Sequence, residues 1–311
     1  MNITRKTFMK SMAFLATSSA APAYASVHTY RKKPDAQPFS FCLNTSTIMG
    51  QGLPLMEELD IAAQAGYEGI EIWIRSVEKH LQEGGTLDDV QKKAEDLGIK
   101  IENAIGFAQW IVDEHDTRTN ALEQAKREMD MLAKVGCNRL AAPPAGATDH
   151  PGLSLDKAAE RFRALCELGE SMGVQPQLEV WGFSQNLSRL SEVLYVAAES
   201  GYGDIKILPD VYHLYKGGSD PDGLSLIHPK RVEIFHLNDY PDIKRQDILD
   251  KDRVYPGDGV APISDILQTI RSEEHPTILS LELFNRNYWK LPPLEAAKRG
   301  LEAMKKVVAD P

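Results

Sequence analysis

Three carboxylates and one imidazole stand at the ends of four successive β-like segments, at Glu179, Asp210, His236 and Glu282. In each segment aliphatic and polar residues alternate, so these four side chains should share the face opposite the aliphatic one. Buried charges are costly unless they are paired or bound to a metal. Three carboxylates and an imidazole suit Mn²⁺, Mg²⁺, Co²⁺ or Zn²⁺, so we predict one divalent metal site. The alternative is a buried ion-pair network whose cation is Lys206, although one lysine cannot neutralise three carboxylates.

Such a site could move a proton to and from carbon. A divalent ion chelated by a sugar carbonyl and a neighbouring hydroxyl makes the adjacent C–H more acidic, and a carboxylate in a dry pocket can remove that proton. Returning the proton gives an epimer or an isomer, whereas a leaving group β to the carbonyl gives elimination. Trp73, Trp110 and Trp181 could form apolar walls for a sugar, or belong to the core. Lys206 could donate a proton to substrate or act as a counter-charge.

Eight short β-rich segments position these residues. We expect the strands at Phe39–Leu43, Gly69–Ile74, Lys100–Ala104, Asn138–Ala142, Pro176–Val180, Asp204–Leu208, Arg231–Leu237 and Thr277–Leu283. In the second of them the isoleucines face outward, which turns Glu71 inward.

Segments with helical periodicity alternate with the strands. They are Leu55–Ala65, Leu87–Leu97, Thr119–Val135, Leu155–Met172, Leu187–Ser200, Ile263–Ile270 and Pro293–Val308, with only a short turn at Pro221–Ile227 for the sixth. Eight β-α units in series predict an α/β fold made of one (β/α)₈ TIM barrel. A doubly wound open sheet is the alternative, but no G-x-G-x-x-G motif follows the first strand.

The polar residues form a recognisable series of motifs. Glu179 is followed by D-x-x-H at Asp210–His213, H-x-x-D at His236–Asp239, P-G-D-G at Pro256–Gly259, and then Glu282. This series resembles the xylose isomerase-like barrels, and most closely their sugar isomerase/epimerase branch. The resemblance extends from about residue 39 to the end of the chain.

The resemblance implies roles for individual residues. Glu179, Asp210, His236 and Glu282 would be the metal ligands, and Glu179 and Glu282 would also form the acid/base pair. His213 and Arg253 would contact substrate oxygens. Apart from the resemblance, Trp181 as an apolar wall and Lys206 as a possible proton donor are counted as candidate substrate-binding residues, because they lie near the ligands in the sequence. The implied enzyme abstracts a proton α to the carbonyl of a keto-sugar. The expected export, and the lack of a P-loop or of clustered Arg and Lys in the sequence, predict that this sugar is not phosphorylated.

One departure and several alternatives limit this assignment. Ketose 3-epimerases carry a second glutamate six residues after the first ligand, where this chain has Gln185. The stretches Trp181–Phe183 and Leu208–Ser219 resemble exported enzymes that eliminate the aglycone from 3-keto-glycosides, which makes a lyase the first alternative. A barrel that binds metal and sugar without catalysis is the second, and a metal-dependent endonuclease the third.

Composition and the N-terminus bound the remaining choices. The chain has 311 residues, 35 Lys and Arg against 45 Asp and Glu, and a net charge of −10, which argues against nucleic-acid binding.

Residues 1–25 have a basic start, an apolar middle and an A-x-A end at Ala23–Ala25, and are expected to be a signal peptide, with twin-arginine-like features. Its removal would change the net charge to −13, since it carries three cations and no acid.

The expected organisation is therefore a signal peptide at 1–25, a linker at 26–38 and a catalytic barrel at 39–311. The mature protein should be periplasmic or secreted, without a membrane anchor, acting on a small sugar or keto-glycoside and open to homo-oligomer formation. Three scattered cysteines, Cys42, Cys137 and Cys166, do not form a disulfide framework.

Overall fold

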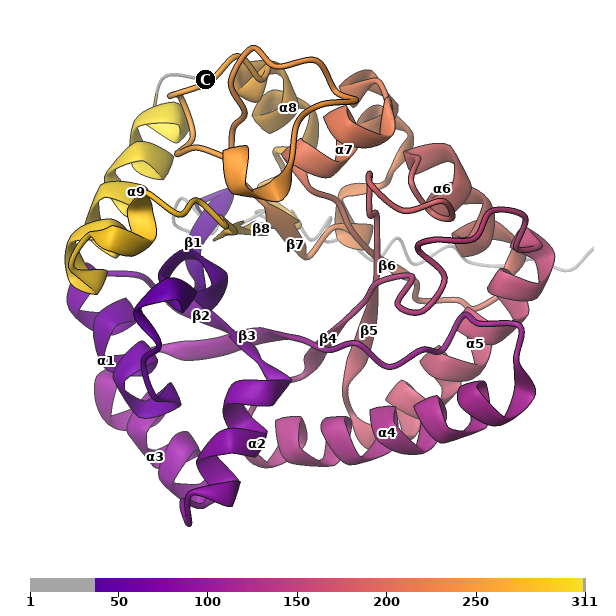
Figure 1. Cartoon of the computed structure of the whole chain (residues 1–311), viewed down its shortest axis with the longest axis horizontal. Coiled ribbons are helices and arrows are strands. Elements are labelled where there is room, and N and C mark those ends of the chain that lie inside the picture. The colour runs from indigo at the N-terminus through magenta and orange to yellow at the C-terminus, as the bar shows by residue number, and fades with distance from the viewer. Residues whose placement is uncertain (1–36, 310–311) are drawn as a thin grey trace, which may run out of the picture. The chain divides into compact units, whose positions relative to one another are not determined.

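The strands of the chain form a ring of parallel β-structure in the computed structural model, which describes residues 37–309 (Figure 1). The predicted signal peptide and nearly all of the predicted linker lie outside the described residues. Within the described range the strands are β1 (Phe39–Asn44), β2 (Gly69–Trp73), β3 (Lys100–Ile105), β4 (Arg139–Ala142), β5 (Gln175–Glu179), β6 (Lys206–Leu208), β7 (Ile234–His236) and β8 (Thr277–Leu281).

Hydrogen bonds divide the ring into two parallel sheets, ordered β3-β2-β1-β8-β7 and β4-β5-β6. Strands β3 and β4 lie side by side at one junction. At the other junction, a single parallel bridge joins Asp210 to His236, and the His236 amide donates to the Pro209 carbonyl at 3.0 Å. The predicted (β/α)₈ barrel is confirmed.

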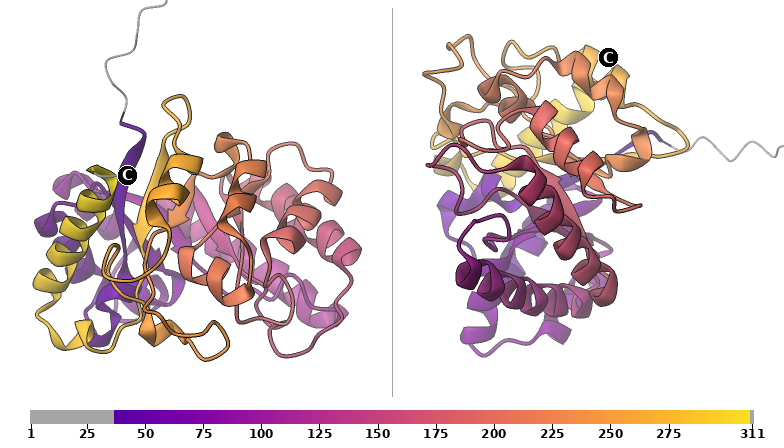
Figure 2. Two further views of the ribbon diagram at one scale, coloured as in Figure 1. Left: turned by 90° about the horizontal axis from the view of Figure 1, so that it is seen from above. Right: turned by 90° about the vertical axis from the view of Figure 1, so that its right-hand side faces the viewer.

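Helices surround the ring on its outer side (Figures 1 and 2). Those within the described range are α1 (Leu55–Ala65), α2 (Ile74–Gln82), α3 (Leu87–Leu97), α4 (His115–Lys134), α5 (Leu155–Met172), α6 (Leu190–Glu199), α7 (Val211–Gly217), α8 (Ile263–Ile270) and α9 (Pro293–Ala309). Several stop at a glycine with positive φ, such as Gly66 (93°) after α1 and Gly173 (69°) after α5. None of the helices described is both long and apolar enough to span a bilayer.

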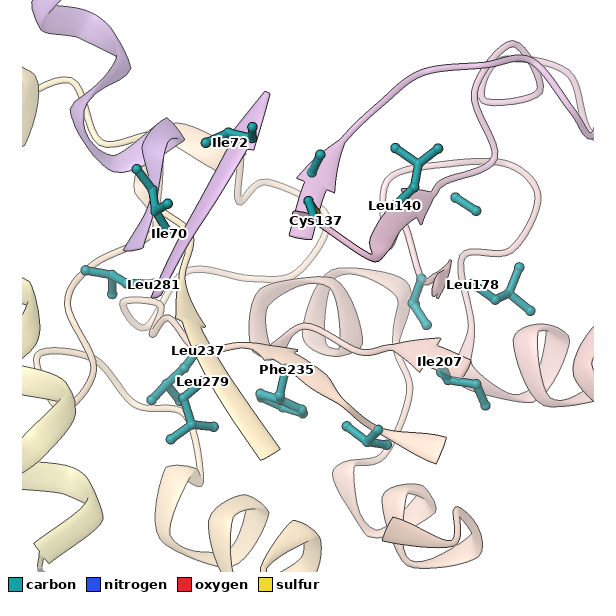
Figure 3. Packing of buried hydrophobic residues seen from close by; sticks show 14 of the residues in the cluster. Ile70, Ile72, Cys137, Leu140, Leu178, Ile207, Phe235, Leu237, Leu279 and Leu281 are labelled. Carbon is teal, nitrogen blue, oxygen red and sulfur yellow. The ribbon is translucent and has the colours of Figure 1, made fainter. Parts of the chain in front are cut away.

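Aliphatic side chains of the strands point away from the ring toward the helices (Figure 3). Ile70 and Ile72 of β2, Leu178 of β5 and Phe235 of β7 are completely buried there. Because successive strand residues face opposite sides, the alternate polar residues must point into the barrel. The outward face predicted from the alternation is therefore confirmed.

Two helices differ from the predictions. Ile74 was expected to end the second strand, but it begins α2 instead, so the i, i+2 spacing of isoleucines extends one residue beyond the strand. The sixth unit was expected to have only a turn at Pro221–Ile227, where a 3₁₀ helix does occur at Pro221–Leu226. It also has α7, which begins directly after Asp210 because the Asp210 carboxylate accepts the His213 amide at 2.7 Å.

Candidate active site

The four predicted ligands converge at the carboxyl ends of β5 to β8. From the Nδ1 atom of His236, the nearest carboxylate oxygens of Glu282, Asp210 and Glu179 lie 3.2, 3.7 and 3.9 Å away. His236 and Asp210 are completely buried, and Glu179 and Glu282 are at most 4% exposed. The structure therefore brings together in space the residues that the sequence places on four separate strands.

The other ring nitrogen of His236 contacts a fourth carboxylate, that of Glu71 on β2. Nε2 lies 3.0 Å from Oε2 of Glu71, whose oxygens also accept hydrogen bonds from Asn44 Nδ2 at 2.7 Å, Asn103 Nδ2 at 2.6 Å and Ser280 Oγ at 2.6 Å. Burial alone would lower the pKa of His236, but Glu282 and Glu71 raise it well above its ordinary value. When the ring is neutral and Glu71 accepts at Nε2–H, the Nδ1 lone pair is directed toward the other carboxylates. Alternation predicted that Glu71 faces inward, but nothing in the sequence identified His236 as its partner.

A buried arginine links two of the predicted ligands. Nη1 of Arg253 donates to Asp210 at 3.0 Å and to Glu282 at 2.8 Å, and Nη2 contacts His213 Nε2 at 3.1 Å and Asp250 at 2.6 Å. Arg253 is only 1% exposed, so its charge compensates these carboxylates in a region with little solvent screening. One guanidinium nevertheless faces more carboxylates than it can neutralise.

The environment separates the two glutamates expected to exchange a proton. Burial, opposed in part by the charge of His236 and assisted by the carboxylate of Glu282, raises the pKa of Glu179 to about 8. Burial alone would also raise the pKa of Glu282, but His236 and Arg253 together hold that pKa below its ordinary value. Two carboxyls with pKa values pushed in opposite directions are typical of an acid and a base at one site.

Unpartnered buried atoms show that the donor set fits a divalent ion. Oε2 of Glu179 and Nδ1 of His236 are buried and make no hydrogen bond to any residue in the described range. A compact group of possible ligand atoms, all within 4.8 Å of one another, is formed by Asp210, His213 and Glu282. Both ring nitrogens of His213 already face donors, since Gly182 N lies 3.2 Å from Nδ1 and Arg253 lies beside Nε2. His236 is therefore the better imidazole ligand.

One cavity of about 400 Å³ lies beside the four predicted ligands, and two of them, Glu179 and Glu282, line it. His213, Arg253 and Trp181, which were expected to contact substrate, line it too. Burial lowers the pKa of His213 well below its ordinary value, and the nearby Arg253 charge lowers it further, so this imidazole is neutral at pH 7.

Lys206 does not reach this cavity, and the prediction that it contacts substrate is wrong. Its Nζ binds Glu233 at 2.8 Å, the Lys230 carbonyl at 3.0 Å and Asp204 at 3.3 Å, at the start of β6. Lys206 does share the inward face with Asp210, but four residues along a strand separate the two by about 13 Å. It belongs to an ion-pair cluster at the opposite end of the barrel.

The remaining aromatic and polar residues singled out from the sequence fall into two groups. Trp73 lines the cavity. Trp110 does not: it is buried in the core, packs against Phe162 and donates to the Pro143 carbonyl at 2.8 Å. Gln185 is exposed and is not among the residues lining the cavity.

Comparison with known proteins places this geometry among related barrels. Residues 59–307 match the family described as xylose isomerase-like TIM barrel. The chain is 26% identical over 274 residues to an inosose isomerase of Bacillus velezensis, covering 86% of this chain and 96% of that protein.

A second relative and a solved structure extend the comparison. A 3-dehydroshikimate dehydratase of Pseudomonas aeruginosa is 23% identical over 259 residues, covering 80% of this chain and 39% of that protein. The crystal structure of the IolI protein with a bound zinc atom superposes with a TM-score of 0.81 at 21% identity, covering 87% of this chain and 98% of that chain.

Proposed function

The chain belongs to the xylose isomerase-like TIM barrel family, and on that premise we propose that it is a metal-dependent, sugar-acting enzyme of the isomerase/epimerase type. The proposed reaction removes a proton from the carbon next to the carbonyl of a non-phosphorylated keto-sugar. The observation that carries the proposal is that Glu179 and Glu282 line one cavity beside the unpartnered Nδ1 of His236.

The residues that would hold the metal are Glu179, Asp210, His236 and Glu282, and the ion would polarise the sugar carbonyl when bound. Glu282 is assigned the first proton transfer, the removal of the proton from carbon, because His236 and Arg253 keep its carboxylate ionised. Glu179, whose pKa is raised to about 8, holds a proton at pH 7 and delivers it to the substrate from its own side. The Glu282 carboxylate is held in place by Asn44 at 3.2 Å and by Arg253. Return of a proton to the same carbon on the opposite face would give an epimer, and return to the neighbouring carbon would give an isomer.

Other cavity residues bind the substrate and keep water away. Arg253 and the neutral imidazole of His213 are placed to contact substrate oxygens, while Trp73 and Trp181 present apolar surface. Excluding water strengthens the interaction of the carboxylates with developing charge.

Elimination is the second candidate reaction of the same site. One relative is named a dehydratase, and proton removal α to a carbonyl leads to elimination whenever a leaving group stands β to it. A 3-keto-glycoside provides such a group in its aglycone.

We further propose that the protein works outside the cytoplasm, because residues 1–25 have the features of a signal peptide. Sugars outside the cytoplasm are not phosphorylated, which agrees with the proposed substrate class.

Deuterium incorporation tests the reaction. Metal-loaded protein is incubated in D₂O with a panel of keto-sugars, keto-sugar phosphates and 3-keto-glycosides, and the C–H exchange and aglycone release are followed by mass spectrometry. Glu179→Gln and Glu282→Gln should each lower kcat by about 10²–10⁴-fold. Metal content is measured for each variant, so that loss of metal is distinguished from loss of the base.

Glu58→Gln is the matched control, since Glu58 is a buried glutamate outside the cavity. This variant should exchange at the wild-type rate. Absence of exchange and release on every substrate, with metal bound, would refute the proposed chemistry, and a strong preference for phosphorylated sugars would refute the substrate class.

A further inference from the structure

Four aromatic side chains form a continuous surface along one wall of the cavity, which we call the aromatic shelf. Its members are Trp73, Phe107, Trp181 and Phe183. Ring centroids lie 5.4 Å apart for Trp73 and Phe107, 6.0 Å for Phe107 and Trp181, and 5.1 Å for Trp181 and Phe183. These are the spacings of packed aromatic pairs, so the shelf is one surface rather than four separate residues.

The outer part of the shelf is exposed in a way that is unusual for this chain. Only six large hydrophobic residues in the described range are exposed, and three of them line this one cavity. Those three are Phe107, Phe183 and Leu249, which are 39%, 41% and 50% exposed. Exposed apolar side chains gathered at one place, rather than scattered, mark a surface that is covered by a ligand or a partner.

The backbone joins the shelf directly to the reacting groups. Trp181 and Phe183 flank Gly182, two to four residues after Glu179, and Gly182 N donates to Nδ1 of His213 at 3.2 Å. A Cβ at Gly182 would lie 2.3 Å from the His213 carbonyl oxygen, so a glycine is required for this close approach. The Phe183 ring in turn lies 5.5 Å from the His213 ring. The shelf therefore begins directly beside the reacting groups and continues to the outer part of the cavity.

We propose that the ligand of this site carries an aryl group attached to its sugar, and that the aromatic shelf binds this aryl group. The inference rests on the proposed function, because it places the reacting sugar at Glu179 and Glu282. Benzyl-type side chains at Phe107 and Phe183 offer no hydrogen bonds, and the indole N–H of Trp73 already donates to Asn44 at 3.1 Å. The shelf therefore suits a flat apolar group better than a second hydroxyl-rich sugar.

Paired glycosides test the shelf without requiring turnover. Metal-loaded protein is titrated calorimetrically with methyl and phenyl glycosides of glucose and galactose, in both anomeric forms, and with cellobiose and lactose. At least one phenyl glycoside should bind about tenfold or more tightly than its methyl partner, as expected for burial of one ring. Phe183→Ala and Phe107→Ala should each remove most of this advantage and leave methyl-glycoside affinity within about threefold.

Leu226→Ala is the matched control, because Leu226 is 77% exposed but does not line the cavity. It should leave every affinity unchanged. Equal affinity for phenyl and methyl partners, or no binding of either, overturns the proposal. Tighter binding of a disaccharide that depends on Phe183 overturns it as well, in favour of a second sugar.

The same measurements separate this proposal from the proposed function. A phenyl preference that depends on Phe183, found without C–H exchange on any keto-sugar, supports the shelf and refutes the chemistry. C–H exchange found without a preference for phenyl glycosides supports the chemistry and refutes the shelf.

Discussion

Replacing Glu71 by glutamine tests whether this residue sets the protonation of His236. The glutamate is completely buried, and its oxygens receive the side-chain donors of Asn44, Asn103, Ser280 and His236. An amide has one acceptor oxygen, so the Glu71→Gln change leaves at least one of these donors without a partner. It also places an N–H₂ group beside Nε2 of His236, next to the one remaining oxygen, and so weakens the preference for the tautomer with the proton on Nε2.

The magnitude follows from these contacts. If the amide nitrogen takes the place of Oε1, Asn103 loses its acceptor, at a cost of about 1–3 kcal/mol for an unsatisfied buried donor. A proton on Nδ1 of His236 removes the lone pair that would bind the metal. Loss of such an orienting carboxylate typically lowers metal affinity about 10–100-fold, or about 1.4–2.8 kcal/mol. Thermal stability is a poor readout, because removing a buried charge has an opposing favourable effect.

Metal affinity and the His236 tautomer are therefore measured directly, by competition with a chelating dye and by ¹⁵N NMR of the imidazoles. Ser280→Ala is the control, since it removes a neutral donor to Glu71 at 2.6 Å and leaves the contact between Glu71 and His236 in place. Its metal affinity should change less than about threefold, well below the loss typical of an orienting carboxylate. An unchanged tautomer together with wild-type affinity in Glu71→Gln would refute the reasoning.

Three further predictions concern stability and processing. Burial raises the pKa of Glu128 to about 7, so folding takes up a proton and wild-type stability falls between about pH 4.5 and pH 7. The free energy of unfolding of Glu128→Gln should thus exceed that of wild type by on the order of 3 kcal/mol at pH 8 and by almost nothing at pH 4. Denaturant unfolding at the two pH values measures this difference, and an equal gain at both pH values would contradict the prediction. Lys206→Met should lower the free energy of unfolding by about 2 kcal/mol, because it leaves Glu233 with one cation fewer. An altered KM in this variant would contradict the finding that Lys206 lies outside the cavity. Mass spectrometry of protein from its native host should show a terminus just after Ala25, and a folded, soluble protein retaining Met1 would exclude cleavage.

The barrel and the direction of its inner residues could be predicted because both follow from periodicity. Alternation within each strand decides which side chains face inward, and it correctly placed Glu71, Glu179, His236 and Glu282 inside. The same rule does not fix height along the barrel axis. Lys206 was misplaced for this reason, since its face was right and its level was wrong.

Contacts between distant elements could not be predicted from one sequence. The pairing of Glu71 with His236 joins residues 165 positions apart, and no local pattern encodes that distance. Phe107 belongs to the third β-α unit and meets Trp181 of the fifth only in the folded ring. Helix α7 did have a local signal, since Asp210 is a good N-cap residue, but the D-x-x-H motif was interpreted only as chemistry.

The junction between β6 and β7 links the proposed chemistry to the mechanics of the ring. One bridge, between Asp210 and His236, and one backbone hydrogen bond close the barrel there. Under the proposed assignment, the two bridged residues are also two ligands, so an ion would fasten this closure of the ring from within. Each tenfold rise of free metal above its Kd would then add about 1.4 kcal/mol against opening of this junction. Metal supply would then affect not only turnover but also the lifetime of the closed barrel, and hence its resistance to proteases.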